Sequence, residues 1–592
     1  MRRTLSVIAL LTALVPAVGT PASAQVVPLG QFSGYSTGTA VHVGAVETGT
    51  TRLVDTEVAF SGANVNSGGL GAALVNEMKQ AYSPAAKATD KSGGRGSGLE
   101  VGAATTVPNL TNANQINPGS LAQAFAPPSS ALITKEFIPV NLDPIVNATL
   151  LRGQAQPIFN SNVCVLGQPI SYGLGYAANA NLVNSGGNSV VASNTVDNAV
   201  HQSKSYTYLT PNGDGTYGLV TETHQILAPV TLLGGTLGLP AVTVETAGEW
   251  VLRTTATGKT GGAKVEYAPV GSVTPTTKVI VVKLAGAEIA SLTTQQLLTG
   301  QGLVVPIPGV GEIAIGEDPR AIGGDAASKP EVAGNGTVAA AAVDVARVTT
   351  LPLAAALGVD IADLRIGHME SRAQVPAGGI QCGIPVNKVG NPTSVVAGED
   401  KVITYTVTIP ADIEDFKAVA CDLVNVKVVD VTTASEGVKF DIVSASNNGT
   451  ISGNKVSWDL GTYKPGADPI VLTVGLKVPY DSAAGKITDT ATATAVLGNC
   501  KGNASANSDS LAGLAKFDAA ALTGSAVFSS EATAGGSALG AGEGALAGAG
   551  PEPVGGVGTG AGGSSQGNSL LIGTALGCVA LAGYLARRRR NG

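Results

Sequence analysis

The chain has 592 residues, enough for several domains, and only 13% of them are charged, against about 25% in an average soluble protein. Six of the 35 basic residues are arginines at the two ends; the rest of the chain carries 29 basic and 42 acidic residues, a net charge of −13. So acidic a balance argues against nucleic acid and anionic lipid as partners of the main body.

The N-terminus has the features of a secretory signal peptide. Arg2 and Arg3 precede an apolar run over residues 5–18, and Ala22-Ser23-Ala24 places small residues where signal peptidase cuts. We expect residues 1–24 to be removed, so that the mature chain begins at Gln25. An uncleaved anchor is the alternative, which the shortness of the run disfavours.

Residues 25–379 are interpreted as a β-rich N-terminal ectodomain, with one or two subdomains left open. Runs rich in β-branched and aromatic residues between Gly, Pro and Asn predict strands at residues 54–60, 133–140, 205–209, 218–224, 241–252, 264–267 and 278–284. A hairpin is expected over residues 204–224, because its Pro211-Asn212-Gly213-Asp214-Gly215 turn tolerates positive φ. Residues 70–81 and 291–298 are predicted as short helices.

Residues 382–500 show a clearer pattern. Apolar and polar residues alternate, as in Ile403, Tyr405, Val407 and Ile409, which is typical of half-buried strands. The pattern predicts strands at residues 384–389, 403–409, 424–428, 438–442, 456–460, 470–478 and 486–496. Seven strands in about 115 residues predict an immunoglobulin-like β-sandwich.

Segments of both regions resemble bacterial surface proteins. Residues 398–409, 426–430, 456–461, 464–466 and 485–491 resemble the conserved-repeat domain of unknown function that is common on bacterial surfaces. Residues 95–102, 248–253 and 365–370 are similar to segments of actinobacterial choice-of-anchor surface proteins. The two resemblances imply a display or stalk role at the cell surface, and neither implies a reaction.

Four of the five cysteines lie in the expected ectodomain, and Cys578 lies in the C-terminal apolar run. In a seven-strand sandwich of alternating direction, the starts of the first and third strands lie at one pole. We therefore expect a Cys382–Cys421 disulfide, which leaves Cys500 over, with Cys164 as its candidate partner. No CxxC occurs and the four histidines are scattered, so no metal site and no cofactor is expected.

A spacer and an apolar run end the chain. Residues 501–568 are predicted as a linker, because they are rich in Gly and Ala. Residues 569–586 are long enough for a transmembrane helix, and the tail at 587–592, with Arg587, Arg588, Arg589 and Arg590, stays cytoplasmic. We expect a single-pass cell-membrane protein with an extracellular ectodomain. No Leu-Pro-x-Thr-Gly occurs, so covalent attachment to the wall is not expected.

Motifs that suggest chemistry have plainer interpretations. Gly563-Ser564-Ser565-Gln566-Gly567 matches the serine-hydrolase pattern, but it lies in the spacer, away from any strand-to-helix turn. Asn212-Gly213-Asp214-Gly215 is interpreted as a turn and His368 as a structural histidine. Tyr206 and Tyr208 share one face of a strand and form a candidate ligand surface, with cross-strand packing as the alternative.

The sequence favours a non-enzymatic display, adhesion or envelope protein, held by its C-terminal helix. Its candidate partners are the membrane, wall polysaccharide and other surface proteins. The alternative is an exported, membrane-anchored hydrolase with an active site in the N-terminal domain. That alternative requires a cleft in which His201, His224 or His368 meets Asp, Glu or Ser.

Overall fold

The computed structural model describes residues 31–48, 51–70, 86–106, 115–116, 119–137, 140–142, 146–159, 164–185, 188–192, 199–232, 240–271, 273–307, 311–316, 331–348, 360–410, 421–500 and 520–535. Strands make up nearly all of their regular structure, so the mainly β class is confirmed. The one helix in these ranges is α1 (Thr294–Leu298), within the segment predicted at 291–298.

Several predicted features lie outside the described residues: the signal peptide, most of the helix predicted at 70–81, the G-x-S-x-G segment, the apolar run at 569–586 and the basic tail. Among the residues that are described, no helix combines the length and the apolar composition needed to cross a bilayer.

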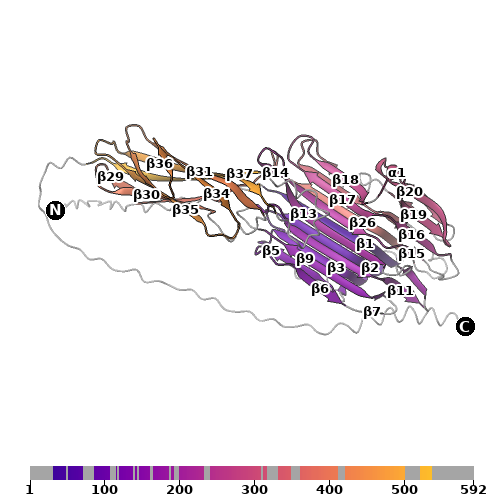
Figure 1. The fold of residues 1–592 in the computed structure, drawn as a ribbon. Coiled ribbons are helices and arrows are strands. Elements are labelled where there is room, and N and C mark those ends of the chain that lie inside the picture. Colours follow the sequence, from indigo (N-terminus) through magenta and orange to yellow (C-terminus); the bar gives the residue numbers. More distant parts are fainter. Residues whose placement is uncertain are drawn as a thin grey trace, which may run out of the picture.

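The largest sheet, here called the long sheet, has eleven strands (Figure 1). Its centre consists of four antiparallel strands in the order β26-β1-β2-β3, each 15 or 16 residues long. They are β1 (Ser33–Thr48), β2 (Thr51–Asn66), β3 (Ser92–Thr106) and β26 (Asp360–Gln374). The others are β4 (Gln115–Ile116), β5 (Ala122–Ala126), β21 (Leu303–Ile307), β22 (Gly311–Ile315), β23 (Glu331–Val332), β24 (Val338–Val343) and β25 (Ala346–Val348).

Two further sheets of eight strands each are formed by strands that alternate between them along the chain. The junction sheet contains β6 (Ile133–Phe137), β9 (Leu150–Pro157), β10 (Ser171–Ala178), β13 (Val200–Pro211), β14 (Thr216–Ile226), β17 (Glu249–Ala256), β18 (Lys264–Val270) and β27 (Ile380–Gln381). The distal sheet contains β7 (Val140–Leu142), β8 (Val146–Ala148), β11 (Asn181–Ser185), β12 (Asn188–Ala192), β15 (Val230–Leu232), β16 (Val242–Thr246), β19 (Lys278–Leu284) and β20 (Ala287–Thr293).

Strands at matching positions of the two sheets are consecutive along the chain. The strand order of the junction sheet, β18-β17-β14-β13-β10-β9-β6, matches the distal order β19-β16-β15-β12-β11-β8-β7. The strand predicted at 241–252 is two strands in the structure, because Gly248, with a φ of +82°, separates β16 from β17. The predicted hairpin at 204–224 is confirmed as β13 and β14.

Glycines bring the long sheet and the junction sheet unusually close together. A Cβ on Gly96 of β3 would lie 1.9 Å from the carbonyl oxygen of Leu174, and one on Gly175 would lie 2.3 Å from that of Phe60. Packed sheets are normally about 10 Å apart with interdigitated side chains. At these positions the two backbones themselves are in contact.

Hydroxyl groups fill much of the remaining space between these two sheets. Ser61 hydrogen-bonds to Ser203 and Ser205 at 2.7 and 2.8 Å, and Thr221 to Ser371 at 2.5 Å. Between the long sheet and the distal sheet the interior is apolar, and valines and isoleucines of these two sheets form the core. The segments 95–102 and 365–370 lie on β3 and β26 of the long sheet.

The second unit is a sandwich of two sheets. The four-stranded sheet contains β28 (Asn387–Asn391), β30 (Val402–Ile409), β35 (Ile470–Lys477) and β32 (Asp441–Ala445). The six-stranded sheet contains β29 (Ser394–Val396), β37 (Ala521–Thr533), β36 (Gly485–Gly498), β31 (Asp422–Ala434), β34 (Lys455–Tyr463) and β33 (Thr450–Ser452). Tyr405, Trp458 and Leu472 belong to its core.

The predicted extent of the sandwich is wrong at its C-terminal side. The described part of the unit has ten strands instead of seven, and β37 lies inside the segment 501–568 that was predicted as a linker. Leu522, Ala526 and Phe528 are buried against the core, and β37 pairs with β36 from Ala521 to Ala532. The interspersed Gly, Ser and Thr residues make this strand resemble a spacer in sequence.

The disulfides join Cys164 to Cys382 and Cys421 to Cys500, so the predicted Cys382–Cys421 pair is wrong. Cys421 precedes β31 and Cys500 follows β36, which are antiparallel neighbours. The prediction missed β33, which forms a hairpin with β34. This extra strand reverses the direction of every later strand, so the end of β36 lies beside the start of β31.

The two units lie in line (Figure 1) and are joined where β14 of the junction sheet begins. Ile380 and Gln381 of β27 pair with Tyr217 and Thr216 of β14, and the Cys164–Cys382 bond follows directly. Buried residues of both units belong to one core cluster. The connection is therefore a packed and covalently tied joint.

Candidate functional site

The strongest group of polar contacts lies on the junction sheet, on the face turned away from the long sheet. Strand register places Tyr206 of β13 opposite Glu222 of β14, Glu222 opposite Arg253 of β17, and Arg253 opposite Glu266 of β18. Four neighbouring strands thus contribute one row of side chains. Cross-strand neighbours of this kind interact directly.

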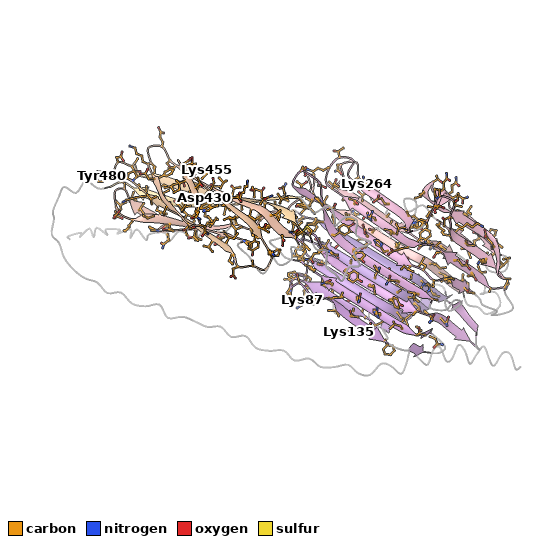
Figure 2. All side chains as sticks on the ribbon, in the orientation of Figure 1. Lys87, Lys135, Lys264, Asp430, Lys455 and Tyr480 are labelled. Carbon is orange, nitrogen blue, oxygen red and sulfur yellow. A yellow bond between two sulfur atoms is a disulfide. The ribbon has the colours of Figure 1, made fainter. Side chains whose placement is uncertain are left out.

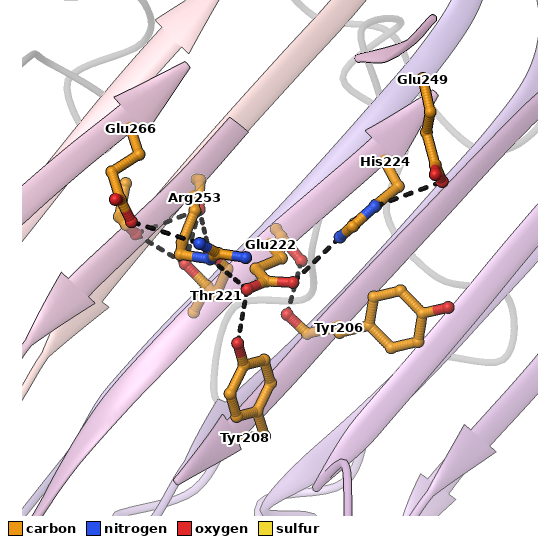
Figure 3. A network of polar contacts seen from close by, with 11 residues as sticks. Tyr206, Tyr208, Thr221, Glu222, His224, Glu249, Arg253 and Glu266 are labelled. Atoms are coloured by element: carbon orange, nitrogen blue, oxygen red, sulfur yellow. Dashed lines mark hydrogen bonds and ion pairs between the residues drawn. The ribbon is translucent and has the colours of Figure 1, made fainter. Parts of the chain in front are cut away.

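Glu222 is the centre of this network (Figure 3). Its carboxylate accepts hydrogen bonds from Tyr208 Oη and Arg253 Nε, and it lies 2.9 Å from His224 Nε2. The other ring nitrogen of His224, Nδ1, lies 3.3 Å from Glu249 Oε1. The side chain of Glu222 is 0% exposed and that of His224 is 2% exposed.

The charges of the network stabilise one another. Burial alone would raise the pKa of Glu222, but the hydrogen bond and charge of His224 and the charge of Arg253 outweigh it and lower that pKa. Burial would lower the pKa of His224, and its hydrogen bonds to Glu222 and Glu249 raise it instead. Near neutral pH this is a buried ion network, with Arg253 partly exposed at its edge.

The candidate ligand surface at Tyr206 and Tyr208 is wrong, because both side chains are only 1% exposed. Tyr206 packs on Tyr172 with ring centroids 5.2 Å apart, and its ring meets His224 edge-on at 5.7 Å. The alternative interpretation, cross-strand packing, describes both tyrosines. Burial also raises the pKa of Tyr208 well above its ordinary value, so its hydroxyl acts as a donor.

The other two candidate histidines, His201 and His368, are also buried. His368 Nδ1 lies 2.6 Å from Asp344 Oδ1, and Nε2 lies 3.3 Å from Glu370 Oε1. His201 is fully buried, and burial lowers its pKa to about 4. His368 is 3% exposed, so its contacts match the structural interpretation.

The Asn212-Gly213-Asp214-Gly215 segment is the β13–β14 turn. Asp214 accepts hydrogen bonds from Thr216 and pairs with Lys259 at 2.7 Å, so protein groups occupy its carboxylate. Gly213 and Gly215 both have positive φ, as the turn requires. Within the described ranges, no three His, Cys, Asp or Glu side chains are arranged to hold a metal ion.

Sequence reasoning singled out the tyrosines and histidines but missed Glu222, Glu249 and Arg253. The available signal was a charged residue at alternate positions of otherwise buried strands. Glu222 and His224 are two residues apart on β14, and Glu249 and Arg253 are four apart on β17, so each pair shares one face of its strand. Only the register of β13, β14 and β17 brings these side chains together.

No family model matches the chain, and no curated protein matches it. Among solved structures, the chain is similar to the N-terminal domain of the Streptococcus gordonii adhesin Sgo0707. That match has 8% identity and a TM-score of 0.16 over 68% of this chain and 90% of that chain. At such a TM-score, the likeness transfers neither a fold nor a function to this chain.

Proposed function

We propose that this chain is a non-enzymatic bacterial surface protein. Its β-rich N-terminal unit is displayed on an immunoglobulin-like stalk, which the segment at 569–586 holds in the cell membrane. The observation that carries the proposal is the closed state of the Glu222 network. Glu222 and His224 are buried, and other protein groups satisfy them, so a substrate has no access to the acid–base pair.

The connection between the two units supports a display role. The β27–β14 pairing, the shared core and the Cys164–Cys382 bond fix the N-terminal unit on the sandwich. A fixed joint presents the distal end of the N-terminal unit far from the membrane. We propose wall polysaccharide or a protein of a neighbouring cell surface as its partner.

The alternative of an anchored hydrolase is tested with the whole ectodomain. His224→Gln and His368→Gln each remove a histidine that contacts carboxylates. We expect both variants to lose thermal stability and to bind wall polysaccharide or partner cells as the parent does. Hydrolysis of wall polysaccharide or peptide by the parent that is lost in either variant would contradict the proposal.

A further inference from the structure

A lysine and two aspartates lie between the two sheets of the sandwich, far along the chain from the Glu222 network. Lys388 on β28 comes from one sheet, and Asp430 on β31 and Asp489 on β36 come from the other. Figure 2 labels Asp430 in this unit. The exposed fractions of the three side chains are 0%, 1% and 0%.

The amine is in contact with both carboxyl groups. Lys388 Nζ lies 2.5 Å from Asp430 Oδ1 and 2.8 Å from Asp489 Oδ2. Strand register fixes this arrangement, because Asp430 pairs with Ala491 and Asp489 with Thr432 on the neighbouring strand. The Thr432 hydroxyl also donates to Asp489 Oδ1 at 2.9 Å.

The surroundings are aromatic and closed. Lys388 Nζ lies 5.4 Å from the centroid of the Tyr405 ring, and that ring packs edge-on against Phe528 at 6.1 Å. The Tyr405 hydroxyl hydrogen-bonds to Ser530 at 2.5 Å. A reaction in this site would be protected from bulk water.

The cluster holds one cation and two acids, which favours a neutral form of one acid. Burial raises the pKa of Asp430 against the attraction of Lys388, and the neighbouring Asp489 raises it further, to about 7. At neutral pH Asp430 is therefore an uncharged carboxyl group for much of the time. Asp489 contacts the same amine from the neighbouring strand, with its Oδ2 2.8 Å from Lys388 Nζ.

We propose that Lys388 and Asp430 condense into an intramolecular amide bond, and that Asp489 accepts the proton that frees the amine. The proposal rests on the contact of one amine with two carboxyl groups inside a closed core. Proximity of this kind converts a slow bimolecular reaction into an effectively unimolecular one. A buried lysine amine is also an established type of protein nucleophile.

The condensation of Lys388 with Asp430 needs no cofactor or co-reactant. The Asp489 carboxylate takes one proton from the Lys388 ammonium, and the free amine attacks Cγ of the neutral Asp430 carboxyl group. The Nζ–Cγ bond forms and the Cγ–hydroxyl bond breaks. The hydroxyl leaves as water with a second proton from the amine, so the products are an amide, protonated Asp489 and one water.

The condensation also removes charge from the core. A buried ion pair carries a desolvation penalty that its mutual attraction offsets only in part. The products carry no charge, so the same core loses that penalty. The bond would cross-link the first strand of the sandwich, directly after the Cys164–Cys382 joint, to the centre of the opposite sheet.

The test is the mass of the full ectodomain after reduction, alkylation and denaturation. We expect it to be lower than the sequence mass by one water, and a protease digest to contain a branched peptide that joins Lys388 to Asp430. An unchanged mass in the parent protein would overturn the proposal, whatever the variants do. A branch through Asp489 would overturn the assignment of roles.

Two variants and one control make the assignment specific. Lys388→Arg keeps the positive charge without a reactive amine, and Asp489→Asn keeps the shape without a proton acceptor; both should show their full sequence masses. Lys455→Arg, at an exposed lysine of β34, should still show the loss of water. Loss of water in Lys388→Arg would contradict the proposal. The result is independent of the proposed display function.

Discussion

Gly96 on β3 and Leu174 on β10 touch backbone to backbone across the interface between the long and junction sheets. A Cβ on Gly96 would lie 1.9 Å from the Leu174 carbonyl oxygen and 2.5 Å from that of Gln154. Both oxygens belong to paired strands, so neither can move without disturbing a sheet. The close approach of the sheets therefore requires glycine at this position.

We predict that Gly96→Ala destabilises the N-terminal unit by about 3 kcal/mol or more, because the new methyl group forces the sheets apart. The free energy of unfolding from urea titration measures this loss. Gly334→Ala is the matched control, since a Cβ there has no neighbour within 4 Å. An equal effect of the two substitutions would show that the contact is not the cause.

The sequence predicted the strands of the sandwich better than their arrangement. Alternation at Ile403, Tyr405 and Val407 is strong because one face of β30 is wholly apolar. The short strand β33 has three exposed residues and no such alternation, so its hairpin was missed and the cysteine pairing was wrong. Strand direction depends on the number of strands, so one missed hairpin misplaces every later strand end.

The sequence also did not predict the polar interior of the N-terminal unit. Serine and threonine on both sides of a strand suggest solvent, yet Ser61, Ser203 and Ser205 are fully buried. Tyr206 and Tyr208 alternate as an exposed aromatic pair would, but both are buried. Period-2 patterns report which residues share a face, and they do not report whether that face is covered.

Acid should destabilise the fold through His201. Burial holds its pKa near 4, below the value of about 6.5 in an unfolded chain, so the unfolded state binds a proton first as the pH falls. Stability should fall by about 3 kcal/mol between pH 6.5 and pH 4 from this group alone. His201→Leu should flatten that part of the stability curve, measured by urea unfolding at several pH values.

His224 should act in the opposite direction. Its folded pKa is raised, so its contribution is complete below about pH 6.5 and is lost as the pH rises through the folded value. His224→Gln should therefore lower stability at pH 6 and flatten the curve on the alkaline side. An alkaline side in His224→Gln that is as steep as that of the parent would contradict the assigned direction.

The Cys164–Cys382 bond should stabilise the joint between the units. Replacing both cysteines by serine should lower the free energy of unfolding by about 2–4 kcal/mol, because a loop of 218 residues is no longer closed. Chemical denaturation under oxidising conditions measures the change. Equal midpoints for the parent and the double variant would show that the β27–β14 pairing and the shared core suffice.

The Cys421–Cys500 bond should limit how far the sandwich extends under force. The two cysteines are 79 residues apart in the sequence, and an extended chain spans about 3.3–3.6 Å per residue. Without the proposed Lys388–Asp430 amide, reduction should add roughly 260–280 Å to the contour length released in single-molecule stretching. With that amide the added length should be roughly 200–220 Å, because the cross-link already bypasses residues 388–430. The same released length with and without reductant would contradict the connectivity.

The central claim, a folded ectodomain held at the cell surface by its C-terminal segment, is tested most directly by truncation after Asn568. The amount of the chain on cells and in the medium is measured for the full and truncated forms. We predict that the full chain stays on the cells, accessible to added protease, and that the truncated chain appears in the medium with both disulfides formed. Retention of the truncated chain on the cells, or its accumulation inside them, would contradict the claim.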